Sequence, residues 1–403
     1  MDRRTGVSVC VWAWLTVSGA RADDGVLTLE GALQRAREQA VPVVSGRWRI
    51  DEARARARGA RVLRDNPVLE TAVGDRSDGA ASDVEVGLSQ TLELGGARRG
   101  RIAAADAALA LETANADQSR VLALRDVALA FQRALAATER VRIAEAAVGH
   151  AEEVHRVAAR RLESGDVADL DVNLAAGAAA RSRSERLSAQ AAAVLATGEL
   201  RTLLALPPDA PLTPSGDLGP RPPGDVAALL AAADVRPDIA AVDAELRGAE
   251  AETALGKGLR WPEVTPGIRY ERDQGTRILW AGLTLGLPLW NRGQEARAAG
   301  EARAARLRHT ATALRRSARQ EVASAYEAYG LRVSAAEALD EAAARLEENE
   351  TLARRSYEEG QIGLGELLLV RRESLEARSL HLERRLAAKE LEMDLLARAG
   401  VWR

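Results

Sequence analysis

Acidic side chains gather around two short glycine-containing stretches of the sequence. The first stretch, ESGDVADLDV, supplies Gly165, Asp166, Asp169 and Asp171. The second stretch, EEGQIGLGEL, supplies Gly360, Gly363, Gly365 and Glu366. Closely spaced carboxylates along a narrow path select or retard cations electrostatically. The alternative is that the acids only cap the helices that follow, or stabilise their first turns; the residues alone leave both readings open.

Other residues that could do chemistry are scarce. His150 and His155 are five positions apart, off the i,i+4 spacing that aligns two ligands on one helix face. The only cysteine, Cys10, lies near the N-terminus, so the rest of the chain offers no thiolate ligand. The sequence has no phosphate-binding loop and no visible serine–histidine–acid motif. We therefore expect no bound metal, no cofactor and no enzymatic activity.

Long helices must position the two acidic stretches. Seven of the 13 prolines lie between Pro207 and Pro223, which predicts a linker over 207–224. The tracts on either side that lack proline permit very long helices. We expect two helices of roughly 100 Å, over 97–162 and 293–358. Each is expected to turn back into a return helix, over 169–205 and 365–398, with tips near 163–169 and 359–365.

A constant offset of 195 residues relates the two halves of the chain. It relates the following pairs: Pro42 and Pro237, Pro67 and Pro262, Leu88 and Leu283, Phe131 and Tyr326, Gly165 and Gly360. Such self-similarity indicates an internal duplication. We expect one repeat over 23–206 and a second over 225–403. Shorter helices are expected to open the repeats, over 28–40, 43–65, 225–234 and 238–259.

The N-terminal segment has the features of a secretory signal. MDRR gives it a positive start, an apolar run follows, and ARA at 20–22 offers a small-x-small cleavage site. We expect residues 1–22 to be removed; a membrane anchor is the alternative, but the apolar run is too short to span. The net charge of −3 gives no whole-chain case for nucleic-acid binding.

Two hairpins, expected over 68–94 and 263–289, carry alternating apolar and polar residues. We expect one face to meet lipid, and its residues are Val84, Val86, Leu88, Leu92, Leu94, Leu279, Leu283, Leu285, Leu287 and Leu289. The alternative is a half-buried sheet in a soluble protein. However, four strands cannot close a barrel, and little else in this alanine-rich chain could cover an apolar sheet face. Trp261, Trp280 and Trp290 are expected to form an aromatic girdle.

Together these features resemble the TolC-like outer-membrane efflux proteins. The resemblance is carried by SQTLELGGARRGR and LGLPLWNRGQEA at the strand-to-helix junctions and by RRSYEEGQIGLGELLLVRRESLEARSLHLERR at the second tip. The LELGG.R form is similar to the CzcC-like metal-cation efflux branch. The resemblance implies a mainly α protein with a small β part, in which a tandem-duplicated helical protomer contributes four strands. Three protomers would form a twelve-stranded β-barrel in the outer membrane of a Gram-negative bacterium, above a periplasmic helical tunnel.

The resemblance also implies a function and partners. The chain would be the passive exit duct of a tripartite efflux system, exporting small solutes that include heavy-metal cations. It would dock on a periplasmic adaptor (membrane fusion protein) and an RND-type inner-membrane pump. The tip acids would form rings around an iris-like gate, with Tyr357 and Arg354 supplying polar links between helices. The alternatives are a periplasmic coiled-coil structural or adaptor protein without a pore, and a secreted helical enzyme.

Overall fold

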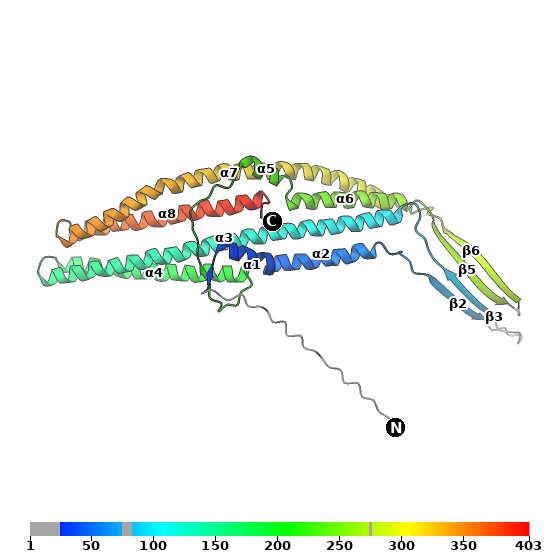
Figure 1. Cartoon of the computed structure of the whole chain (residues 1–403), viewed down its shortest axis with the longest axis horizontal. Coiled ribbons are helices and arrows are strands. Elements are labelled where there is room, and N and C mark those ends of the chain that lie inside the picture. Colours follow the sequence, from blue (N-terminus) through cyan, green and yellow to red (C-terminus); the bar gives the residue numbers. More distant parts are fainter. Residues whose placement is uncertain (1–24, 75–82, 274–275, 403) are drawn as a thin grey trace, which may run out of the picture.

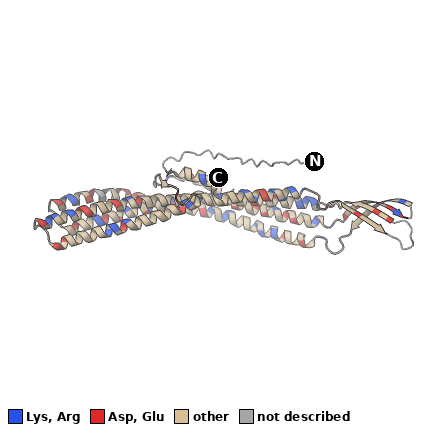
Figure 2. Ribbon diagram, turned by 90° about the horizontal axis from the view of Figure 1, so that it is seen from below, with Lys and Arg blue, Asp and Glu red and all other residues tan. Residues whose placement is uncertain are grey.

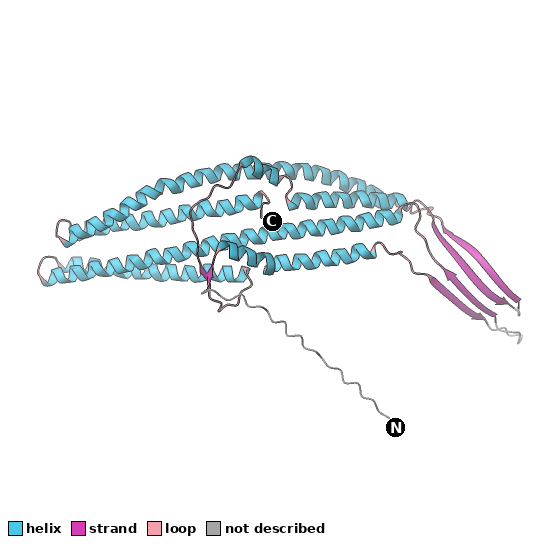
Figure 3. Cartoon of the chain, in the orientation of Figure 1, coloured by secondary structure: helices cyan, strands magenta, loops and turns pink. Residues whose placement is uncertain are grey.

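The chain forms an elongated bundle of helices that carries a small sheet at one end (Figure 1). A computed structural model describes residues 25–74, 83–273 and 276–402. The expected signal segment, 1–22, lies outside the described residues. Helices dominate the described chain, the four-stranded sheet lies at the far end of the molecule, and a short two-stranded pair lies near mid-length (Figure 3). This arrangement confirms the expectation of a mainly α protein with a small β part.

Each half of the chain contributes two long helices and two shorter ones. The helices of the first half are α1 (Leu29–Gln39), α2 (Val41–Gly59), α3 (Ala97–Glu163) and α4 (Asp169–Leu203). Those of the second half are α5 (Val226–Ala233), α6 (Pro237–Gly258), α7 (Gln294–Glu358) and α8 (Leu364–Arg398). The longest, α3 and α7, contain 67 and 65 residues. Their tips with α4 and α8 lie at the end of the molecule opposite the sheet (Figure 1).

Helix α2 ends six residues before the expected position 65. The carbonyl groups that follow it are bound by arginines from the first turns of α3: Arg101 donates to the carbonyl of the C-cap residue Ala60 at 2.7 Å, and Arg98 donates to that of Arg61 at 2.6 Å. These bonds satisfy acceptors that a helix end leaves free. The chain can therefore leave the helix early and cross to the sheet.

The sheet is antiparallel and joins the two halves of the chain. Its strands are β2 (Val68–Gly74), β3 (Asp83–Ser89), β5 (Glu263–Asp273) and β6 (Thr276–Gly286), in the order β2-β3-β5-β6. The two hairpins meet where β3 pairs with β5, with Val86 opposite Tyr270. The sequence did not predict a second, parallel pair, in which β1 (Val26–Leu27) binds β4 (Thr213–Pro214) of the proline-rich linker.

Small apolar clusters are strung along the helices in place of one thick core. The largest lies at mid-length, where Leu124 and Phe131 of α3 pack with Leu200 of α4 and Met393 of α8. Alanine supplies most of the buried residues, so the helices approach closely. Charged residues are distributed along the whole length of the helices (Figure 2). No described helix combines the length and the apolar composition needed to cross a membrane.

Glycines permit backbone contact where the helices meet the sheet. A Cβ atom on Gly258 of α6 would lie 2.4 Å from the amide nitrogen of Ala97, at the start of α3. A Cβ on Gly256 would lie 2.6 Å from the amide nitrogen of Arg297, near the start of α7. We call this contact of α6 with α3 and α7, made by Gly100, Gly256 and Gly258, the glycine joint. It fixes both strand-to-helix junctions against one helix end.

Candidate functional site

The two helical tips end in the same backbone motif. After α3, the amide of Asp166 donates to the carbonyl of Arg161 at 2.8 Å, and Gly165 has a φ of +80°. After α7, the amide of Gln361 donates to the carbonyl of Ser356 at 2.7 Å, and Gly360 has a φ of +75°. Such a helix ending requires a left-handed residue, which glycine supplies without a Cβ clash.

Tyr357 and Arg161 connect the two tips. The Arg161 guanidinium lies 5.2 Å from the centroid of the Tyr357 ring and donates to the Tyr357 carbonyl at 3.0 Å. The tyrosine is 2% exposed, and its hydroxyl is buried without a hydrogen-bond partner among the described residues. Burial, together with the nearby Asp171 carboxylate, raises the pKa of Tyr357. The hydroxyl therefore stays protonated and remains a hydrogen-bond donor.

An apolar cluster from all four long helices surrounds this tyrosine. We call it the tip cluster; its buried members are Val154, Val157, Ala158, Ala175, Tyr357, Leu364 and Leu367. It packs the α3–α4 hairpin against the α7–α8 hairpin immediately behind the turns. The cluster and the Arg161 contact therefore hold the two hairpins of one chain together at the tip.

The predicted tip acids lie beside the turns but make no capping bonds of their own. Asp166 accepts a hydrogen bond from the Ser164 hydroxyl at 2.9 Å. Asp169 and Asp171 occupy the first turn of α4, whose N-cap is Ala168 and has no side-chain cap bond. Glu366 occupies the equivalent turn of α8. None of these acids is therefore an N-cap, but Asp169, Asp171 and Glu366 lie in first turns, as the alternative interpretation also allowed, and this position suits the helix dipole. Their role in a gate stays a prediction.

The other predicted tip residues divide into two kinds. Gly363 is the N-cap of α8 with a φ of −78°, and Gly365 lies in its first turn, so neither has the positive φ of Gly360. Arg354 is half-buried on α7 and forms no ion pair with a described residue. Within one chain the polar link to Tyr357 comes instead from Arg161, which lies in the last turn of α3 as Tyr357 lies in the last turn of α7.

A buried charge cluster lies behind the tip and was not predicted. Glu350 of α7 accepts a hydrogen bond from the Ser374 hydroxyl at 3.1 Å. Two arginines of α8 face the same carboxylate, Arg371 at 3.6 Å and Arg378 at 3.7 Å. His150 of α3 lies 3.5 Å from it. Arg371 also donates to the carbonyl of Ala147 in α3. This Glu350 cluster is a second connection between the hairpins.

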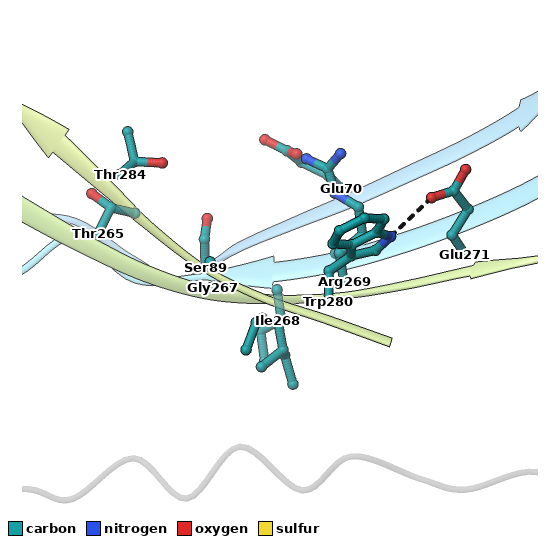
Figure 4. A pocket seen from close by; sticks show the side chains of 13 residues that line it. Glu70, Ser89, Thr265, Gly267, Ile268, Arg269, Glu271, Trp280 and Thr284 are labelled. Carbon is teal, nitrogen blue, oxygen red and sulfur yellow. Dashed lines mark hydrogen bonds between the residues drawn. The ribbon is translucent and has the colours of Figure 1, made fainter. Parts of the chain in front are cut away.

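The sheet has one polar and one apolar face. Thr265, Ser89 and Thr284 project to one side of the sheet and Ile268 to the other (Figure 4). The polar side lines a concavity of about 650 Å³. There Arg269 pairs with Glu85 at 2.7 Å. Trp280 donates to Glu271 at 3.1 Å, so Trp280 lies on the polar face and not in the expected lipid-side girdle.

The apolar face is exposed in the single chain. Leu279 is 76% and Leu283 61% exposed. Of the predicted lipid-facing residues, the described strands contain Val84, Val86, Leu88, Leu279, Leu283 and Leu285. Four others lie beyond the strand ends and correct the expected hairpin bounds: Leu92, Leu94, Leu287 and Leu289. Pro288 lacks an amide hydrogen and cannot extend the ladder of β6.

Comparisons with known proteins agree with this architecture. Residues 32–206 match the outer membrane efflux protein family. The cobalt-zinc-cadmium resistance protein CzcC of Cupriavidus metallidurans is 28% identical over 274 residues, which are 67% of this chain and 65% of that protein. The aligned region therefore spans slightly less than two thirds of that curated relative.

Solved structures share the fold over nearly the whole chain. A crystal structure of CusC matches with a TM-score of 0.77 at 19% identity, covering 92% of each chain. The Vibrio cholerae protein VceC matches with a TM-score of 0.74 at 18% identity, over 92% of this chain and 96% of that one. The open-state Neisseria gonorrhoeae channel MtrE matches with a TM-score of 0.77 at 21% identity, over 92% and 88%.

MtrE is an outer membrane channel, VceC an outer membrane protein and CzcC a resistance protein, which agrees with the expectation that the chain is not an enzyme. The family match covers the first repeat, and the shared fold extends through the second. The first repeat therefore matches the model of the outer membrane efflux protein family, and the chain as a whole shares the fold of the solved channel proteins, with the two-faced sheet and the paired helical tips in place.

Proposed function

We propose that the protein is the outer-membrane exit duct of a tripartite efflux system and works as a homotrimer. The observation that carries this proposal is the exposed apolar face of an open four-stranded sheet. Four strands cannot close a barrel, and large exposed apolar patches mark interaction surfaces. Three copies would supply twelve strands, turn the apolar faces to lipid and satisfy the free edges of β2 and β6.

In this assembly the polar face of the sheet lines the lumen. That face carries more carboxylates than cationic groups, since Glu70, Glu85 and Glu271 accompany the single Arg269 in and beside the concavity. An acidic lining favours cations over anions. The cobalt-zinc-cadmium resistance assigned to the CzcC relative points in the same direction. Small solutes, with heavy-metal cations among them, are therefore the cargo we propose.

The paired tips are the proposed periplasmic gate. Arg354, which forms no ion pair with a described residue, is suited to a polar link with a neighbouring protomer, and Tyr357, whose hydroxyl is buried, would link the two hairpins within one chain. Rings of Asp166, Asp169 and Asp171 would surround the entrance. The gate would open like an iris when a periplasmic adaptor binds, and an inner-membrane pump of the RND type would supply the energy. The duct itself would be passive.

The two repeats contribute equivalent parts to the proposed assembly. We propose that 23–206 and 225–403 each supply one hairpin of the barrel and one helical pair of the tunnel. The linker over 207–224 would join them around the outside of the bundle. It is held there by β4, because the amide of Thr213 donates to the carbonyl of Gly25 at 2.8 Å and Ser215 donates to that of Leu27 at 2.9 Å.

A deletion strain tests the function. Loss of the gene should sensitise the cell to exported compounds, so the strain is exposed to divalent metals, dyes and antibiotics and then complemented. Sensitivity to divalent metals alone supports metal-cation export, and broad sensitivity supports general solute export. Unchanged resistance to all three classes, with the pump and adaptor expressed, would contradict the proposal.

A further inference from the structure

Cationic side chains surround the junction between the sheet and the helices. Arg99 lies in the first turn of α3, Lys257 in the last turn of α6, and Arg260 just after α6. All three are exposed, and none forms an ion pair with a described residue. Arg292, which precedes α7, uses its side chain only to bind the carbonyl of Leu289 at 3.2 Å. Blue ribbon segments mark cationic residues at this end of the helices (Figure 2).

The neighbouring acids do not neutralise this charge. Glu93 pairs with Arg101, and Glu263 pairs with Arg64 at 2.7 Å. Glu301 pairs with Arg297 at 3.2 Å. These carboxylates are therefore already matched by other arginines. Glu295, exposed in the first turn of α7, forms no ion pair with a described residue, but it is a single carboxylate beside several cations, so the junction keeps an excess of positive charge. We call Arg99, Lys257, Arg260 and Arg292 the basic collar.

Two exposed tryptophans lie at the same level. Trp261 is 62% exposed, and its side chain lies against Gly95, where a Cβ atom would come within 2.1 Å of the indole Cδ1. Trp290 is 86% exposed and lies three residues before Gly293. Trp261 lies between α6 and β5, and Trp290 lies between β6 and α7, so both occupy the level at which the sheet meets the helices. Exposed indoles in this position are typical of the boundary between lipid tails and headgroups.

The glycine joint holds these groups together. Because α6 contacts the starts of both α3 and α7 through backbone atoms, the cations on all three elements stay at one height below the apolar face. Anionic headgroups attract basic residues that lie beside a membrane surface. The positive charge of the basic collar, its position below the apolar face and the two flanking tryptophans therefore match one partner, a layer of phosphate-bearing lipid headgroups.

We infer that the basic collar binds anionic phospholipid headgroups and sets the depth of the barrel in the membrane. The inference rests on the proposed membrane barrel, because the collar needs the apolar face above it to lie in lipid. It adds a preference for anionic over zwitterionic lipid that the barrel alone does not require. Phosphates of the headgroups would occupy the cationic positions, and Trp261 and Trp290 would lie immediately above them.

The test compares the full-length protein in two kinds of vesicle. Wild type and the triple variant Arg99→Gln, Lys257→Gln, Arg260→Gln are inserted into phosphatidylcholine vesicles with and without phosphatidylglycerol, and flotation measures the inserted fraction. Wild type should prefer the anionic vesicles. The triple variant should lose at least roughly tenfold of that preference, because each surface cation contributes about 1 kcal/mol near an anionic membrane.

Two matched variants separate specific binding from net charge. The triple variant Arg306→Gln, Arg316→Gln, Arg384→Gln removes the same charge from exposed helix positions away from the sheet, and it should keep the wild-type preference. An Arg99→Lys, Arg260→Lys variant should also keep it. An unchanged preference in the collar variant, or an equal loss in the distant one, overturns the inference. Equal insertion of wild type into both kinds of vesicle overturns headgroup binding by the basic collar but is compatible with the proposed membrane barrel. A lack of insertion into either kind of vesicle overturns both proposals.

Discussion

Arg161 of α3 lies over the ring of Tyr357 in α7, with 5.2 Å between the guanidinium carbon and the ring centroid. The contact joins the two hairpins of one chain within one turn of their tips. It is partly desolvated, because the tyrosine is 2% exposed. A cation–π contact of this kind contributes about 1–2 kcal/mol. When a gate at the tips opens, it must therefore either break this contact or move the two hairpins together as one unit.

Removing the arginine is expected to loosen the closed tip. Arg161→Ala loses the ring contact and the bond to the Tyr357 carbonyl, so the closed state should lose about 1–2 kcal/mol. Single-channel recordings should show a larger or more frequently open conductance. Arg160→Ala is the matched control, since Arg160 is exposed and makes only a 3.8 Å ion pair with Glu153. Identical recordings from both variants and wild type would show that the Arg161–Tyr357 contact does not hold the tip closed.

Acid pH is expected to weaken the Glu350 cluster through His150. Burial lowers the pKa of His150, Glu350 raises it, and Arg371, Arg354 and Arg378 lower it further. A base with a lowered folded pKa binds its proton more weakly in the folded state. Its contribution to stability is therefore complete above the ordinary pKa of about 6.5 and is lost as the pH falls through that value towards the folded pKa.

Hydrogen exchange measures this loss. Amides of α7 and α8 beside the Glu350 cluster should exchange faster at about pH 5 than at about pH 7 after correction for the intrinsic rate. His150→Gln should remove this part of the pH dependence, because its side chain does not titrate. His155→Gln, on the same helix, should retain it. The prediction fails if His150→Gln and wild type show the same corrected pH profile.

The two faces of the sheet should respond oppositely to a charge. Leu283→Arg introduces a cation on the apolar face, where it costs about 2–4 kcal/mol at the centre of a bilayer. Thr284→Arg introduces the same side chain on the polar face and should be tolerated. Membrane fractionation and heat-dependent gel migration report insertion and trimer formation. Normal insertion of Leu283→Arg would show that this face does not meet lipid.

The glycine joint should reject even one methyl group. A Cβ on Gly256 would lie 2.6 Å from the backbone nitrogen of Arg297, so Gly256→Ala must push α6 and α7 apart. We expect a loss of about 1–3 kcal/mol. Gly177→Ala, on α4 with open space around it, should instead stabilise by about 0.5–1 kcal/mol. Thermal unfolding of both variants measures the difference; equal midpoints would argue against close backbone packing.

Local patterns predicted much of the fold. The absence of proline located α3 and α7, and alternation located β2, β3, β5 and β6. The positive-φ glycines, Gly165 and Gly360, were recognisable from their spacing of 195. The predicted ends of helices and strands were wrong where contacts between distant residues determine them. Helix α2 ends early, where Arg98 and Arg101 bind the carbonyls of the two residues that follow it, and β6 stops at Gly286.

Contacts between distant residues were the part that the sequence could not predict. Arg161 is one of many arginines on α3, and only the packing of α3 against α7 brings it to Tyr357. Glu350 and Arg371 likewise resemble the solvated charges around them until three helices bury them together. The β1–β4 pair comprises two residues from each strand, too short for any periodic signal.

Reconstitution of the purified full-length chain in planar lipid bilayers tests the central claim most directly. The account predicts a detergent-stable trimer that dissociates on heating and inserts as a discrete, cation-preferring conductance. Neutralising Asp166, Asp169 and Asp171 to asparagine should reduce that preference. A soluble monomer that produces no conductance steps would contradict the account.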